Sequence, residues 1–189
     1  MDRRTFSTLL AVNLFAPTAL RAQPAPIDGG PFVATPMLVV EEMLKLGEVG
    51  AKDRVYDLGS GDGRLVIEAA RRGARGVGVE REARLVELSR VEAAKAGVAD
   101  KVRFVTGDIF NVGLREATVV TLYLLPVLLD RLAPKLSAEL PAGARVVSHD
   151  FPLAWKAETV RTFESEEKAQ RLGFGTTQLF LYRAPGRPG

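Results

Sequence analysis

The chain has 189 residues, 47% of them hydrophobic, which predicts one domain with a substantial core. It contains no cysteine and one histidine, so disulfides and thiolate metal sites are excluded and we expect no metal centre. The net charge of +3 comes largely from the N-terminus, and no basic patch with interleaved aromatic residues follows, so we expect no nucleic-acid partner.

The first part of the chain is predicted to lie outside the folded domain. Arg3 and Arg4 resemble a twin-arginine export motif, and an apolar stretch from Leu9 to Leu20 follows them. A charged segment before a short apolar one is typical of a signal peptide, although an anchor is the alternative. We therefore expect residues 1–22 to be a signal peptide or a membrane anchor, 23–30 a linker rich in Pro and Gly, and 31–189 the folded domain.

The folded part alternates between helix and strand patterns. Thr35 and Pro36 predict the start of a helix, with Thr35 as its N-cap, and Gly47 predicts its end. Apolar runs predict strands at 53–58, 76–80, 102–106, 117–122 and 144–148. Amphipathic stretches predict helices at 65–72, 82–96 and 127–140, the last interrupted or bent at Pro134.

Two further stretches, 159–163 and 177–182, alternate apolar and polar residues and predict a terminal pair of strands at the sheet edge. Strands that alternate with helices indicate the α/β class. The sequence therefore predicts a doubly wound, mainly parallel seven-stranded sheet with an antiparallel edge strand. Ligands of such sheets bind beyond the carboxyl ends of the strands, so candidate site residues are sought there.

A glycine-rich loop joins the first predicted strand to the helix after it. Glycines at these positions let the backbone approach a ligand closely. The spacing differs from a dinucleotide fingerprint, because Arg64 stands where the third glycine would be, and a carboxylate before the loop would repel a diphosphate. An ordinary strand-to-helix turn is the alternative. The candidate ligand-binding residues here are Asp57, Gly59, Ser60, Gly61 and Gly63.

Acidic residues also end the second and third predicted strands. Glu80 can accept two hydrogen bonds from a ribose diol, and Asp108 can accept one from an adenine amino group. Ile109 or Phe110 can pack on the adenine face. The alternatives are that Glu80 caps the helix near Glu82 and that Asp108 stabilises a turn. Their order at consecutive strand ends favours one nucleoside-binding site.

The loop resembles the first motif of class I S-adenosylmethionine (SAM) methyltransferases. Segments 31–36, 56–64, 121–126 and 146–149 further resemble the protein-lysine methyltransferases of ATP synthase c-subunit and adenine nucleotide translocase, over about 31–155. More distantly, they resemble the non-SET histone lysine methyltransferase. The resemblance implies SAM as cofactor, whose ammonium suits Asp57, and a protein lysine as acceptor. The alternatives are a small-molecule methyltransferase and a nucleoside-binding protein without turnover.

The resemblance also implies roles at the fourth strand and upstream of the first. Tyr123 is the candidate catalytic residue lining a substrate channel, with Leu124 and Pro126 shaping its wall and Phe32 closing over the cofactor. Tyr123 as an ordinary strand-end aromatic is the alternative. His149 is either structural or a general base. The N-terminus favours export to the periplasm, whereas cofactor supply favours an anchor that faces the cytoplasm.

Overall fold

The computed structural model describes residues 32–186. The predicted signal peptide or anchor at 1–22 and the linker at 23–30 therefore lie outside the described residues. The described chain begins with helix α1 (Met37–Leu46), which leads into strand β1 (Arg54–Leu58). The elements that follow are α2 (Arg64–Arg71), β2 (Arg75–Glu80), α3 (Ala83–Lys95), β3 (Val102–Thr106), β4 (Val119–Leu122), α4 (Pro126–Glu139), β5 (Arg145–His149), β6 (Thr159–Glu164), α5 (Glu166–Leu172) and β7 (Thr176–Arg183).

The strands form one seven-stranded sheet in the order β3-β2-β1-β4-β5-β7-β6. Strands β1 to β5 are parallel, and β7 pairs antiparallel with both β5 and β6. The predicted α/β fold is confirmed. The antiparallel strand lies one place in from the edge, because β6 forms the edge and β7 returns between it and β5.

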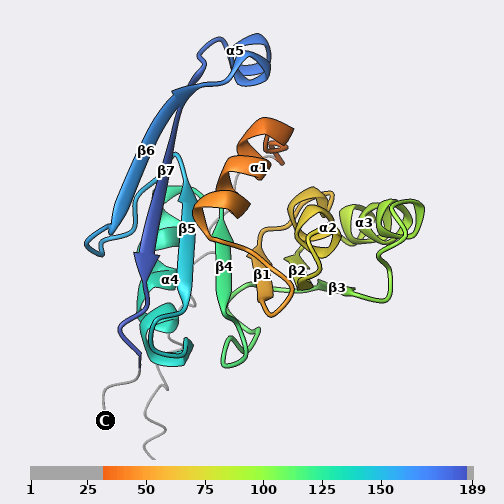
Figure 1. Ribbon diagram of the computed structural model, residues 1–189, viewed down its shortest axis with the longest axis horizontal. Helices are drawn as coiled ribbons and strands as arrows, with labels where there is room; N and C mark the ends of the chain where they lie inside the picture. Colours follow the sequence, from red (N-terminus) through yellow and green to blue (C-terminus); the bar gives the residue numbers. More distant parts are fainter. Residues whose placement is uncertain (1–31, 187–189) are drawn as a thin grey trace, which may run out of the picture.

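Helices cover both faces of the sheet (Figure 1). Helices α1 and α2 pack on one face through residues such as Val40, Leu44 and Leu65, against Val55 of β1. Helix α4 packs on the opposite face, against alternate residues of the same strand that include Leu58. Side chains in a strand point alternately to the two faces, so β1 is buried from both sides, and its burial explains its apolar composition.

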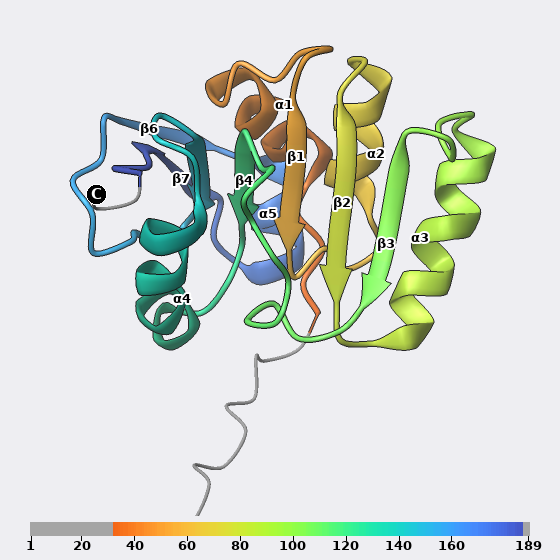
Figure 2. The same ribbon diagram turned by 90° about the horizontal axis from the view of Figure 1, so that it is seen from below.

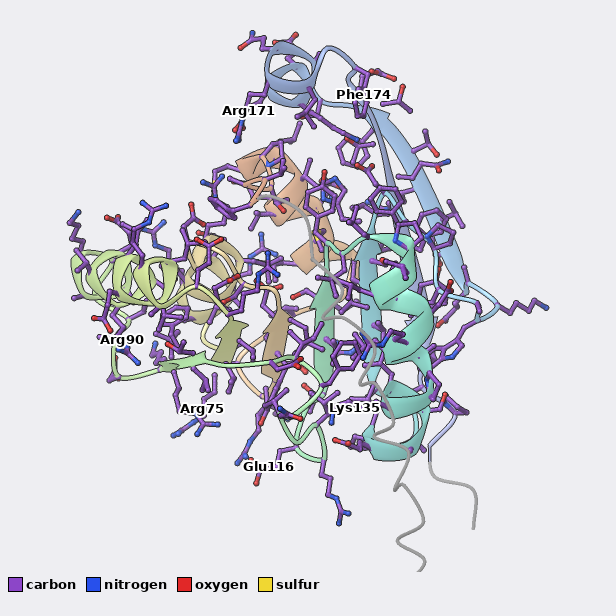
Figure 3. All side chains as sticks on the ribbon, turned by 180° about the vertical axis from the view of Figure 1, so that it is seen from behind. Arg75, Arg90, Glu116, Lys135, Arg171 and Phe174 are labelled. Carbon is purple, nitrogen blue, oxygen red and sulfur yellow. The ribbon has the colours of Figure 1, made fainter. Side chains whose placement is uncertain are left out.

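The carboxyl ends of the parallel strands lie at one edge of the sheet. Figure 2 shows β1, β2 and β3 side by side with their arrowheads at the same edge. Helix α5 follows the end of β6 (Figure 1), and Arg171 of α5 and the nearby Phe174 lie far from Arg75 and Glu116 in the view of Figure 3. Within residues 32–186, none of the helices combines the length and apolarity that crossing a membrane requires.

One local prediction was wrong, one was wrong in part, and one helix was not predicted. Thr35 does not cap α1, because the N-cap is Pro36 and no side chain supplies a capping hydrogen bond. Helix α4 runs through Pro134, which lies inside its bounds, without interruption. Helix α5 was not predicted, although its start and end carry local signals: the Ser165 side chain accepts from the backbone N–H of Lys168, and Gly173 ends the helix at φ 81°.

Candidate active site

The glycine loop turns sharply between β1 and α2. Gly59, Gly61 and Gly63 have φ values of 87°, 53° and 79°, in the left-handed region that other residues rarely adopt. The backbone N–H groups of Gly59 and Ser60 both donate to the carbonyl of Val79 in β2, at 2.9 and 3.0 Å. The loop is thereby held against the end of the neighbouring strand, with little side-chain bulk between backbone and ligand space.

Residues 32–36, which we call the strap, lie across this loop. A Cβ added at Gly61 would overlap the ring of Phe32, with Cδ2 at 2.8 Å. Arg64 at the start of α2 donates to the carbonyl of Thr35 at 2.8 Å while it pairs with Asp62 at 2.6 Å. From the other side, Arg171 of α5 donates to the carbonyl of Ala34 at 3.2 Å. The strap is therefore tied both to the loop and to α5.

Asp57 is the buried carboxylate at the end of β1. It accepts a hydrogen bond from the Thr121 hydroxyl of β4 at 2.8 Å. Burial raises the pKa of Asp57 to about 7; the Thr121 hydrogen bond opposes this rise, and the charges of Asp62 and Glu80 add to it. A cation placed beside this carboxyl would favour its ionised form and would itself be bound by the charge.

Glu80 and Asp108 each make the structural contact that was the alternative to ligand binding, and each can still bind a ligand. The two oxygens of Glu80 accept from the backbone N–H groups of Gly61 at 3.0 Å and Glu82 at 2.9 Å, so the side chain joins the loop to the start of α3. Asp108 accepts from the backbone N–H of Phe110 at 2.9 Å, which stabilises a turn. A carboxylate has roughly four lone-pair positions, so both groups retain acceptor capacity for a ligand.

A cavity of about 380 Å³ lies at the carboxyl ends of the strands. The predicted residues that line it are Phe32, Asp57, Gly59, Ser60, Glu80, Asp108, Ile109, Tyr123 and Leu124. Gly61 lies under Phe32, and Gly63 packs near Phe104 and Ser89. Pro126 is the exposed first residue of α4 and is not among the lining residues. The structure therefore brings together the residues predicted from four separate strand ends.

Sequence reasoning missed two pairs that also line this cavity. Asp62 and Arg64 form the ion pair described above, and Arg131 of α4 lies over the ring of Phe110 at 4.5 Å from its centroid. A cation this close to an aromatic face is attracted by it. No local sequence signal places Arg131 there, because α4 reaches Phe110 only through the packing of α4 on the sheet.

Tyr123 and His149 form a stacked pair at the ends of β4 and β5. Their ring centroids are 4.0 Å apart, with 30° between the planes. His149 is buried and does not line the cavity, whereas Tyr123 does. Burial lowers the pKa of His149 to about 4, which Asp150 opposes and Lys168 reinforces. The imidazole is therefore neutral at physiological pH.

The charged and polar side chains that line the cavity suit a nucleoside that also carries a positive charge. Five carboxylates and three arginines line the cavity, and one arginine is already paired with Asp62. Ser60 Oγ is buried and has no hydrogen-bond partner among the described residues. The volume is within the range of small-molecule sites. In the part of the chain that the structure describes, no group of three or more metal-ligating side chains comes together.

Solved structures of similar fold hold a ligand of this kind. A crystal structure from Salinibacter ruber, titled as an RNA methyltransferase in complex with S-adenosyl-L-homocysteine, is 45% identical with a TM-score of 0.73 and covers 83% of this chain and 97% of that one. S-adenosyl-L-homocysteine is SAM without its transferable methyl group. The fold and the site thus define a SAM-dependent methyltransferase.

Sequence comparisons narrow this class. A sequence model described as the ANTKMT methyltransferase domain matches residues 57–159. A protein-lysine N-methyltransferase of Saccharolobus islandicus is 42% identical over 133 residues, 69% of this chain and 83% of that protein. Mouse adenine nucleotide translocase lysine N-methyltransferase is 38% identical over 158 residues, 82% of this chain but 64% of that protein. The chain belongs to the ANTKMT methyltransferase domain family, and the predicted resemblance is confirmed.

Proposed function

We propose that this protein transfers a methyl group from SAM to the side-chain nitrogen of a protein lysine. The observation that carries the proposal is the composition of the cavity, in which carboxylates at the β1 to β3 ends adjoin an apolar and aromatic wall at the β4 end, formed by Tyr123, Leu124 and Leu128. Relatives that are 42% and 38% identical are named for lysine methylation, which supports the same acceptor here.

The residues divide into two groups by proposed role. Asp57 would hold the cofactor's ammonium, Glu80 the ribose hydroxyls and Asp108 the adenine amino group, with Ile109 against the ring. The backbone of the glycine loop would lie along the cofactor. When bound, SAM supplies a methyl group on a positively charged sulfur. Phe32, in the strap, would exclude water from the loop side of the cavity.

The acceptor amine must be neutral to attack, because an ammonium has no lone pair. An apolar wall lowers the pKa of an amine by disfavouring its charged form. Tyr123 and Leu124 line the cavity and are proposed to form that wall. Methyl transfer demands an in-line approach, so most of the catalysis is the holding of two reactants in one orientation. Pro126, the first residue of α4, is proposed to support the wall from outside the cavity.

RNA is the acceptor that deserves a direct comparison, since the Salinibacter ruber structure is titled an RNA methyltransferase. The balance of five carboxylates to three arginines in the cavity lining disfavours a polyanion at this site. A protein acceptor is therefore preferred. The other alternative functions are a methyltransferase that acts on a small molecule and a protein that binds the cofactor without turnover.

The test is transfer of label from methyl-labelled SAM to a cell extract by the full chain. Samples are then treated with protease, with ribonuclease, or passed through a small-pore filter, and Gly61→Arg serves as the inactive control. We expect protease-sensitive label that is recovered as methyl-lysine after acid hydrolysis. Label that ribonuclease removes, a labelled filtrate compound other than SAM that is absent with Gly61→Arg, or tight SAM binding with no transfer to any fraction would each overturn the proposal.

We propose further that residues 1–22 direct the protein to the membrane or across it, as an export signal or an anchor. The support is the arginine pair followed by an apolar stretch, Leu9 to Leu20. Fractionation of cells that express the untagged protein, with N-terminal sequencing of each fraction, distinguishes the two. A periplasmic protein that lacks the first residues indicates a signal, and a membrane-bound intact chain indicates an anchor. An intact chain in the cytoplasm contradicts both.

A further inference from the structure

The stacked rings of Tyr123 and His149 arise from the register of two strands. In the parallel pairing of β4 and β5, Leu122 lies opposite Ser148. The next residue of each strand is aromatic, so Tyr123 and His149 are placed side by side at the cavity end of the sheet. Their centroid separation of 4.0 Å and angle of 30° between the planes make a close, tilted ring contact.

His149 is enclosed on all sides. Its relative exposure is 0%, and neither ring nitrogen has a hydrogen-bond partner among the described residues. The nearest ionisable partner is Asp150, with 3.5 Å between Nε2 and Oδ2. An apolar ring would fill the same space without two unsatisfied nitrogens, which are costly to bury. The histidine therefore calls for a reason beyond packing.

Burial is the main reason that His149 stays uncharged, and Lys168 of α5 adds to it. Lys168 of α5 is 2% exposed, and its ammonium holds both oxygens of Asp150, at 2.8 and 2.6 Å. The backbone N–H of Gln178 in β7 also donates to Asp150. The carboxylate is thus already satisfied, and a second cation on the imidazole would face the buried ammonium. Burial, reinforced by Lys168 and only partly opposed by Asp150, leaves His149 neutral.

We propose that His149 is a positioning residue for methyl transfer, whose neutral ring stacks on Tyr123 and fixes the aromatic wall that receives the acceptor lysine. The inference rests on the proposed function. A lysine reaches the wall as an ammonium, which an electron-rich aromatic face attracts, and it must then lose its proton before it attacks. A protonated imidazole on the same tyrosine would repel that ammonium. Burial keeps the imidazole uncharged, and Lys168, which holds the neighbouring Asp150, reinforces it and so links α5 to the acceptor side of the cavity.

The first test uses the fact that the chain contains one histidine. The full-length protein, labelled with ¹³C and ¹⁵N in histidine, gives one set of imidazole signals, followed from pH 4 to 8. We expect a neutral ring above pH 5, ring protons shifted upfield by Tyr123, and loss of that shift in Tyr123→Leu. An ordinary histidine titration, at about 6.5, or signals indifferent to Tyr123→Leu, would overturn the proposal.

The second test separates stacking from general folding. His149→Phe keeps an aromatic ring, whereas His149→Ala removes it. With labelled SAM and a protein extract as acceptor, we expect His149→Ala to raise the half-saturating extract concentration about tenfold, and His149→Phe to stay within about threefold of the wild type. SAM affinity, measured by calorimetry, should change less than twofold in both.

The outcomes distinguish this proposal from the proposed function. If both variants match the wild type, or if the Phe variant is as weak as the Ala variant while SAM still binds, the stacking role is wrong. If no extract protein is methylated by the wild type, the proposed function fails, and the imidazole spectra still decide whether the neutral stack exists. The Tyr123→Leu spectra require no replacement of His149, so a misfolded histidine variant does not prevent the decision.

Discussion

The two halves of the cavity are built in different ways. At the ends of β2 and β3, carboxylates are tied to backbone N–H groups of nearby turns, as Glu80 is to Gly61. At the ends of β4 and β5, side chains contact side chains from distant elements, as Asp150 does with Lys168. Backbone contacts tolerate many sequences, whereas side-chain contacts depend on each partner. The first half is therefore suited to a shared cofactor, and the second to a particular acceptor.

The largest expected effect is at the glycine loop. Gly61→Arg places a side chain at φ 53° where a Cβ already overlaps Phe32. We expect SAM affinity to fall at least a hundredfold, about 2.7 kcal/mol, as measured by calorimetry. Gly97→Arg is the matched control, because Gly97 has φ 68° but nothing within 4 Å of its added Cβ. An equal loss in the control would mean that strain, and not the site, accounts for the result.

Glu80→Gln tests whether the carboxylate has a role beyond joining the loop to α3. The amide keeps the shape but turns one acceptor into a donor, opposite the backbone N–H groups of Gly61 or Glu82. We expect roughly a thirtyfold loss of SAM affinity, about 2 kcal/mol. Glu87→Gln, on the exposed surface of α3, should leave affinity unchanged. Unchanged affinity in Glu80→Gln would reduce Glu80 to the structural role.

The raised pKa of Asp57 predicts that the affinity for SAM, which binds in the cofactor half, depends on pH. Burial raises its pKa to about 7, so in the free protein the carboxyl is mostly protonated at pH 6 and mostly ionised at pH 8. A bound ammonium requires the ionised form, so affinity for SAM should rise about tenfold over that interval. Asp57→Asn should remove the dependence. A flat profile in the wild type would separate Asp57 from the ammonium.

His149 predicts the smallest effect, on stability in the acceptor half. Its pKa is lowered to about 4 by burial, so the unfolded chain binds a proton near pH 6 that the folded chain does not. Its contribution to the free energy of unfolding should therefore be about 1 kcal/mol smaller at pH 6 than at pH 8. Urea denaturation of wild type and His149→Phe at both pH values isolates this contribution from the opposite trend of Asp57. Parallel changes in the two proteins would contradict it.

The cofactor half could be predicted because its signals are local. Three glycines with an acidic residue before them fix a strand-to-helix turn, and the acidic residues after β2 and β3 each follow a short apolar run. Both structural alternatives for Glu80 and Asp108 were also visible in the sequence, and both contacts exist. An acidic residue at a strand end has the same sequence pattern whether it stabilises a turn, binds a ligand or does both.

The acceptor half could be predicted only in part. The position of Tyr123 after an apolar strand was evident, but its contact with His149 depends on the pairing of β4 with β5. Helix α5 has too few residues for an apolar stripe, so the capping residue Ser165 was its main signal. Its burial of Lys168 against Asp150 joins residues that lie 18 positions apart. No periodicity within one element encodes such a contact.

The sequence by itself determined the order of strands and helices apart from α5, and the glycine turn. These follow from backbone conformation and hydrophobic periodicity, which act over a few residues. The class of cofactor followed from the resemblance of the glycine loop to a known family. Only the tertiary structure decided which strand ends share one cavity, that the strap lies over Gly61, and that His149 stacks neutral against Tyr123. Those features depend on strand register and burial, which arise when distant segments exclude water together.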